Sequence, residues 1–189
     1  MILSGFLGNR YAQKFPLAIS AHIAMEQSYG YVDGDSASMA ELICLISALI
    51  HSPIDQSFAI TGSVNQYGEA QAIGGVNEKI EGFFRLCKAR GLTGKQGVII
   101  PAANQRNLVL HDDVLEAVKA GEFHVYCVRH VDEAIHLLLD REPGIADADG
   151  NFPEGSVNGE IIKRLEAIAR MADPSSKTDN SQKDNAGDK

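Results

Sequence analysis

The feature that most constrains the fold is an alternation of short apolar runs with helical patterns along residues 56–140. The apolar runs are rich in Val, Ile, Phe and Tyr and too short for helices, which is typical of strands. Between them, apolar residues recur at helical spacing, and glycine follows two of the helical patterns, where it can end a helix. The pattern predicts strands over 56–64, 69–73, 97–101 and 123–128, and helices over 76–90, 112–121 and 131–140.

The flanking segments extend this pattern. They predict a strand over 17–27, a helix over 35–51, a hairpin turn over 65–68, a loop over 142–157 and an amphipathic helix over 158–171. Hairpins and helices that share one small core indicate an α+β fold. We expect three parts: a compact domain over 1–140, a loop and C-terminal helix over 141–172, and a disordered tail over 173–189, which lacks large aliphatic residues.

Composition excludes several classes of function. The 189 residues carry a net charge of −8, which argues against general binding to a nucleic-acid backbone. The longest apolar stretch, residues 42–50, is too short to cross a bilayer, and the N-terminus lacks the pattern of a signal peptide. Cys44, Cys87 and Cys127 are odd in number and lie in apolar surroundings, which predicts buried free thiols and a cytoplasmic protein.

Three motifs that suggest ligand binding lack parts that they need. The "GLTGK" of residues 91–95 lacks the four-residue spacer of a phosphate-binding loop. The "DADGN" of residues 147–151 lacks the glycine and glutamate of a calcium loop, so we expect a solvated turn. The set His124, Cys127 and His130 has no zinc spacing, because its first two members would lie on opposite faces of a strand. The sequence predicts no metal site.

The stretch "YVDGDSASMAEL", residues 31–42, crowds acids, glycine and serines directly before an apolar helix. Such a turn can simply cap the helix, because short polar side chains accept hydrogen bonds from the first backbone N–H groups. It can also hold a serine hydroxyl near the positive end of the helix dipole, ready for nucleophilic chemistry. Composition alone leaves both interpretations open.

A second polar signal lies in "AIGGVNEKIEGFF", residues 72–84, where Lys79 occupies the first turn of a predicted helix. The partial positive charge of a helix N-terminus and burial would both favour a neutral lysine amine, which is the form that a general base requires. The alternative is a surface lysine paired with Glu78 or Glu81. A neutral lysine can activate a serine without any histidine, so the two stretches together suggest a Ser-Lys nucleophile pair.

The two stretches also carry a family resemblance. "DGDSAS", then "TGSVNQYGEAQAIGGVNEKI", then "GVIIPAAN" follow in the same order as in the proteolytic domain of Lon proteases, which are Ser-Lys peptidases joined to AAA-type ATPases. The resemblance covers residues 17–139. Asp35 and Ser38 replace the proline and glycine of the common bacterial form, as in the archaeal-type branch and its bacterial relatives.

The resemblance implies a catalytic dyad of Ser36 and Lys79, which are 43 residues apart, as in the family. Ser38 would point roughly 200° away from Ser36 around a helix, and "SMAE" fits a capping box with Ser38 as the N-cap. The resemblance also implies that Thr61 orients the lysine. The alternative for Thr61 is an ordinary β-branched strand residue.

Two further residues match positions near the dyad in the resemblance, and each also has a structural interpretation. Asp33 matches an acidic residue near the dyad, but it could equally cap the helix. His22 matches a histidine near the site of some relatives, whereas Ala24 stands at the place of their second histidine. A strand histidine without a catalytic role is an equal interpretation of His22.

The resemblance implies the proteolytic part of an ATP-dependent serine endopeptidase, acting on protein or peptide substrates within a hexameric ring. The sequence contains no Walker motif, so we expect no cofactor in this chain; ATP and Mg would belong to the ATPase module of such proteins. This absence and the strand-like start suggest a domain separated from a longer protein. The alternatives are a non-catalytic interaction domain that retains the fold and an ATP-independent Lon-like peptidase.

Overall fold

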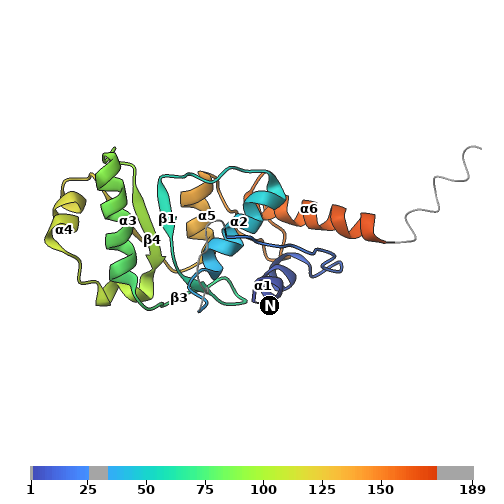
Figure 1. The fold of residues 1–189 in the computed structure, drawn as a ribbon. Helices are drawn as coiled ribbons and strands as arrows, with labels where there is room; N and C mark the ends of the chain where they lie inside the picture. Colours follow the sequence, from blue (N-terminus) through green and yellow to red (C-terminus); the bar gives the residue numbers. More distant parts are fainter. Residues whose placement is uncertain (1, 26–33, 174–189) are drawn as a thin grey trace, which may run out of the picture.

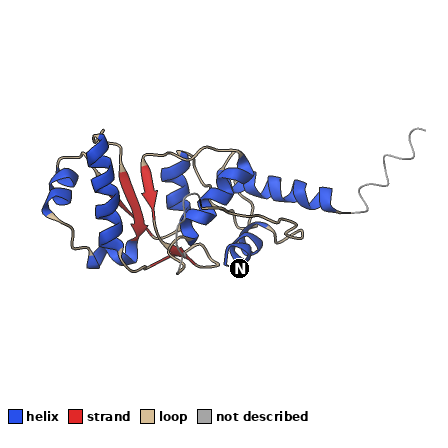
Figure 2. Ribbon diagram, viewed as in Figure 1, coloured by secondary structure: helices blue, strands red, loops and turns tan. Residues whose placement is uncertain are grey.

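A three-stranded parallel sheet lies between two layers of helices in the computed structural model (Figure 1; Figure 2). The structure describes residues 2–25 and 34–173. The elements are α1 (Ile2–Tyr11), α2 (Ser38–Ile50), β1 (Phe58–Ile60), β2 (Ser63–Val64), β3 (Ala70–Gln71), α3 (Val76–Arg90), β4 (Gly97–Pro101), the 3-10 helix η1 (Ala102–Asn107), α4 (Asp112–Lys119), β5 (His124–Val128), α5 (Val131–Leu139) and α6 (Val157–Ala172). The predicted α+β fold is confirmed.

The central sheet has the strand order β1-β4-β5, with every pair parallel. Strand β4 is buried on both faces, because helices cover both sides of the sheet. Val98 and Ile100 pack with α3 and α4, whereas Ile99 packs with α2 and α5. This double cover explains why "GVIIP" is continuously apolar instead of alternating with polar residues.

The predicted strand over 56–64 is divided between two sheets. Strand β1 ends at Ile60, and β2 begins at Ser63 and pairs with β3 in an antiparallel hairpin whose turn is the predicted one at 65–68. Gly62 lies between the two strands, so close to α2 and β4 that no side chain fits there. A Cβ atom at Gly62 would lie 2.1 Å from Met39 Cε and 3.1 Å from Pro101 Cγ.

The helices predicted from periodicity are all present, with small shifts at their ends. Helix α2 buries the apolar stripe that its sequence shows, and α3 ends at Gly91, whose φ of 93° favours glycine. Helix α6 packs against α1 and α2 and places Val157, Ile161 and Leu165 in their core. The 147–151 segment is a turn closed by the Asp147 carboxylate, which accepts two backbone N–H bonds.

The N-terminal region differs from the prediction. Residues 2–11 form helix α1, which the sequence did not predict, and no strand forms over 17–25. The predicted continuation of that strand to residue 27 lies outside the described residues. Helix α1 is held by contacts distant in sequence: Phe6 and Leu7 are buried, and the Tyr11 hydroxyl donates to Asn158 Oδ1 at 2.7 Å. Burial raises the pKa of Tyr11.

A charged cluster joins α1 to the start of α5. The Arg10 guanidinium pairs with the Asp132 carboxylate, and His130 Nδ1 lies 3.3 Å from the same carboxylate. The interaction with Asp132 raises the pKa of His130, and partial burial offsets only part of this rise. Burial opposes ionisation of Asp132, but the His130 hydrogen bond and the Arg10 charge outweigh it and hold the Asp132 pKa below its usual range.

The cysteines partly contradict the prediction of buried thiols. All three are free, but Cys44 is exposed, Cys127 is half-buried and only Cys87 is buried. Within residues 2–25 and 34–173, no helix combines the length and apolar character needed to cross a membrane. Over the same described part of the chain, no three His, Cys, Asp or Glu side chains are grouped so as to hold a metal ion.

Candidate active site

Three polar side chains meet where the parallel strand β1 ends. Thr61 directly follows β1, Ser36 lies in the turn before α2, and Lys79 lies in the first turn of α3. The carboxyl edge of a parallel sheet is where α/β proteins commonly place their sites, because loops and helix N-termini converge there. The fold therefore brings together residues that are 18 to 43 positions apart in the sequence.

The contacts among these side chains are direct. Lys79 Nζ lies 2.9 Å from Ser36 Oγ and 3.2 Å from Thr61 Oγ1. The Thr61 hydroxyl in turn donates to the Ser36 carbonyl oxygen at 3.3 Å. The serine is half-buried, the lysine is exposed and the threonine is buried at 8% exposure. A nucleophile and a base within hydrogen-bond reach, with a third group orienting the base, make up the minimal arrangement for nucleophilic catalysis.

Backbone hydrogen bonds fix the position of the serine. The Gly62 N–H donates to the Ser36 carbonyl at 2.8 Å, and the Gly62 carbonyl accepts the Met39 N–H at 3.1 Å. The Ser38 N–H donates to the Asp35 carbonyl at 2.9 Å and so closes a turn around Ser36. The segment directly after β1 thus holds the turn that presents the serine hydroxyl.

Ser38 does not form the predicted capping box. The N-cap of α2 is Ala37, which makes no side-chain cap, and Ser38 is the first helical residue. The Ser38 hydroxyl instead accepts the Val64 N–H at 3.0 Å and is buried at 8% exposure. This hydrogen bond connects α2 with β2. The hydroxyl partners of the Lys79 amine are Ser36 and Thr61, not Ser38.

Lys79 lies in the first turn of its helix, as predicted, but its side chain is not buried. The residue is exposed, so the prediction of burial is wrong. The alternative pairing with Glu78 or Glu81 is not formed among the described residues either: the lysine amine bonds to Ser36 and Thr61, and Glu81 pairs with Arg85 and His111. Gly75 precedes the helix with a φ of 66°, a backbone conformation that favours glycine, and so begins α3 at the point that directs Lys79 toward Ser36.

Neither Asp33 nor His22 is placed at the dyad by the described residues. Asp33 lies outside the described residues, so its position relative to the dyad stays a prediction. His22 is exposed and lies in the irregular segment that replaces the predicted strand. Sequence analysis assigned no catalytic role to Asp35, which directly precedes Ser36 and whose carboxylate accepts a hydrogen bond from the Ser63 hydroxyl at 2.6 Å.

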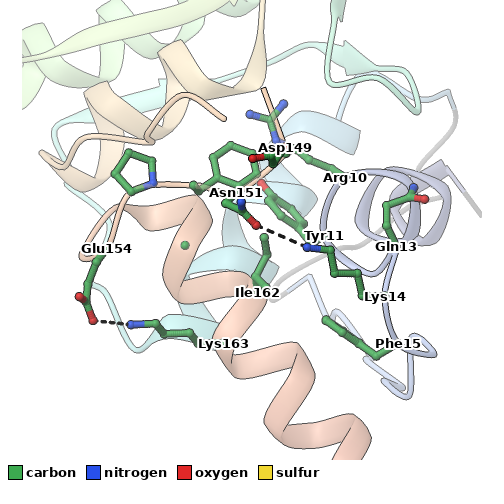
Figure 3. A pocket seen from close by; sticks show the side chains of 14 residues that line it. Arg10, Tyr11, Gln13, Lys14, Phe15, Asp149, Asn151, Glu154, Ile162 and Lys163 are labelled. Carbon is green, nitrogen blue, oxygen red and sulfur yellow. Dashed lines mark hydrogen bonds and ion pairs between the residues drawn. The ribbon is translucent and has the colours of Figure 1, made fainter. Parts of the chain in front are cut away.

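A separate cavity of about 470 Å³ lies between α1, α6 and the loop around residue 150 (Figure 3). Its wall combines apolar side chains such as Phe15 and Ile162 with charged ones, among them Lys163, which pairs with Glu154 at 2.8 Å. Its lining includes neither Thr61 nor any residue of α3 or of the turn at residues 35–38, the serine turn. The cavity is therefore not part of the candidate active site.

The comparisons with known proteins agree on one family. The family profile described as Lon protease (S16) C-terminal proteolytic domain matches residues 11–141. A Lon protease homolog of Escherichia coli is 55% identical over 140 residues, which are 74% of this chain and 24% of that protein. A Lon protease homolog of Haemophilus influenzae is 46% identical over 171 residues, covering 89% of this chain and 28% of that protein.

More distant relatives carry the same family name. An archaeal Lon protease of Methanocaldococcus jannaschii is 39% identical over 119 residues, which are 63% of this chain and 16% of that protein. The chain thus spans about a quarter of the length of its bacterial relatives and less of the archaeal one. On the extent of the profile match and these identities, the chain belongs to the Lon protease C-terminal proteolytic domain family.

Proposed function

We propose that the chain is a serine peptidase in which Ser36 is the nucleophile and Lys79 is the general base. The observation that carries this proposal is the 2.9 Å separation of Lys79 Nζ and Ser36 Oγ, with Thr61 as a second partner of the amine. A neutral lysine amine can accept the proton of a serine hydroxyl at this distance. The family membership supports peptide bonds as the substrate class.

The proposed reaction needs only side chains, backbone and water. Ser36 Oγ attacks the carbonyl carbon of the peptide bond, and its proton passes to Lys79 Nζ. The resulting ammonium then gives the proton to the leaving amine, so that the C–N bond breaks and an acyl-serine remains. A water molecule attacks that ester, with Lys79 again taking and returning the proton.

The oxyanion formed in each half-reaction requires hydrogen-bond donors. The N–H groups of Ser38 and Met39 already donate to Asp35 and Gly62 and are thereby committed. We therefore assign this role to the N–H groups of Ser36 and Ala37, which lie at the positive end of the α2 dipole.

The wider setting of the reaction is a further part of the proposal and rests on the family membership. We propose that the chain acts as the proteolytic part of an ATP-dependent, cytoplasmic Lon-like protease and that its full-length form is a homo-oligomer, a hexameric ring. ATP and Mg would then act outside the residues of this chain, whose own reaction uses neither. An extended or unfolded substrate is required, because a peptide bond must reach Ser36 in the turn before α2.

The test is incubation of this chain with unfolded casein and with a stably folded protein, each with and without ATP and Mg. We expect slow cleavage of casein only, equal with and without ATP, lost in Ser36→Ala and in Lys79→Ala, and faster as pH rises because the base must be neutral. Cleavage that persists in Ser36→Ala would contradict the proposed nucleophile. Complete absence of cleavage by the wild-type chain would favour an interaction domain, and ATP-stimulated cleavage would contradict the proposed division of roles.

A further inference from the structure

The serine turn makes a second set of contacts that the proposed reaction does not use. The Ser63 hydroxyl, on β2, donates to Asp35 Oδ2 at 2.6 Å. This length lies within the roughly 2.5–2.7 Å range of hydrogen bonds from a hydroxyl to a charged carboxylate, which are about twice as strong as neutral ones. Ser63 is buried at 2% exposure, so its hydroxyl needs an acceptor within the protein.

The hydrogen bond between Asp35 and Ser63 is one of two that connect the serine turn to β2. Asp35 and Ser38 are the first and last residues of the turn that contains Ser36, and their side chains bind successive residues of β2, Ser63 and Val64. The proposed nucleophile lies between these two attachment points. Its own carbonyl accepts hydrogen bonds from the Gly62 N–H and the Thr61 hydroxyl.

We propose that Asp35 is a positioning residue, whose hydrogen bond with Ser63 holds Ser36 Oγ within reach of Lys79 Nζ. The inference rests on the proposed function. A displacement of the serine by about 1 Å would lengthen the 2.9 Å contact beyond a hydrogen bond, and misplacement of this size can slow a reaction about 100-fold. Asp35 itself lies outside the reaction because it exchanges no proton in it.

The structure also explains why loss of this contact would affect rate more than stability. Gln71 Oε1 lies 3.5 Å from Ser63 Oγ and offers a second acceptor from β3. When Asp35 is removed, the buried hydroxyl can turn to this amide oxygen and need not stay unpaired. Asp35 itself is exposed, so its truncation leaves no cavity.

The experiment compares Asp35→Ala, Ser63→Ala and the double variant by kcat and KM on an unstructured fluorogenic peptide. We expect kcat to fall about 10- to 100-fold with KM little changed, and the double variant to match the single ones, because all three lose the same bond. Asp35→Asn keeps an acceptor oxygen and should retain activity within about threefold. Asp149→Ala, on an exposed loop, is the matched control and should equal the wild type.

Full activity of Asp35→Ala and Ser63→Ala, or losses that multiply in the double variant, would overturn the positioning role. If Ser36→Ala is inactive while Asp35→Ala is fully active, the positioning role fails and the proposed function stands. If Ser36→Ala keeps its activity, the proposed function itself fails. Should Asp35→Ala not fold, Ser63→Ala breaks the same bond from its donor side and decides the result alone.

Discussion

Replacing Thr61 with valine should slow peptide cleavage about 30-fold while the fold stays intact. Valine keeps the branched shape of threonine at this buried position but replaces the hydroxyl with a methyl group. Two hydrogen bonds disappear: Lys79 Nζ loses a partner at 3.2 Å, and the Ser36 carbonyl loses a donor at 3.3 Å. Among the described residues, the lysine amine then keeps one partner, the serine that it must deprotonate.

The magnitude follows from these two contacts. Lys79 becomes a charged ammonium as it takes the serine proton, so its bond to Thr61 counts as one to a charged group, at about 1.5–3 kcal/mol, whereas the bond to the Ser36 carbonyl is neutral, at about 0.5–1.5 kcal/mol. Both contacts are long, so we take the lower ends. Their sum is about 2 kcal/mol, and each 1.36 kcal/mol corresponds to a factor of ten in rate, which gives the factor of about 30. Folding stability should change by less than about 1 kcal/mol, because Lys79 is exposed and water can solvate its amine.

The assay is kcat/KM on an unstructured fluorogenic peptide, with the urea unfolding midpoint measured in parallel. Thr61→Ser is the matched control, because it keeps the hydroxyl and loses only the methyl group. We expect the serine variant to stay within a few-fold of the wild type. The reasoning is refuted if Thr61→Val cleaves at the wild-type rate, or if Thr61→Ser is as slow as the valine variant.

Two further predictions concern folding stability. Tyr11→Phe should lower the free energy of unfolding, measured by urea titration, by about 1–3 kcal/mol, because the Oδ1 atom of the fully buried Asn158 loses its hydrogen-bond donor at 2.7 Å. An unchanged urea midpoint would contradict this prediction. The pKa of His130 is raised in the folded state, so its contribution to the free energy of unfolding is full below about pH 6.5 and is lost as pH rises through the raised value. The pKa of Asp132 is lowered, so its contribution is full above about pH 3.9 and is lost as pH falls through the lowered value. The thermal midpoint should therefore fall as pH rises from about 6.5 through the raised His130 pKa, and less so in Asp132→Asn. An equal fall in both proteins would argue against this pairing.

The elements that could be predicted from the sequence are those whose structure is determined by residues close together in the sequence. The apolar stripe of α2, the glycine that ends α3 and the hairpin at 65–68 each carry their signal within a few residues. The spacing of Ser36, Thr61 and Lys79 in a family-like order also located three side chains that the fold brings together.

The wrong predictions fall where distant contacts decide the structure. Helix α1 contains glycine at positions 5 and 8, which lowers its helix propensity, and its helical state depends on packing against α6. The Ser38 capping box is locally consistent, but the Val64 N–H on β2 binds the same hydroxyl. The exposure of Lys79 depends on how α3 sits on the sheet, and no periodicity within α3 contains that information.

The identity of the nucleophile is tested most directly by covalent labelling. A fluorophosphonate reagent forms a P–O bond with an activated serine and releases fluoride, and peptide mapping by mass spectrometry then locates the adduct. We predict one adduct, on Ser36, which is absent in Ser36→Ala and in Lys79→Ala and is retained in the control Ser47→Ala, a serine of α2 outside the site. An adduct on Ser38, or labelling of Ser36 that is unaffected by Lys79→Ala, would contradict the account.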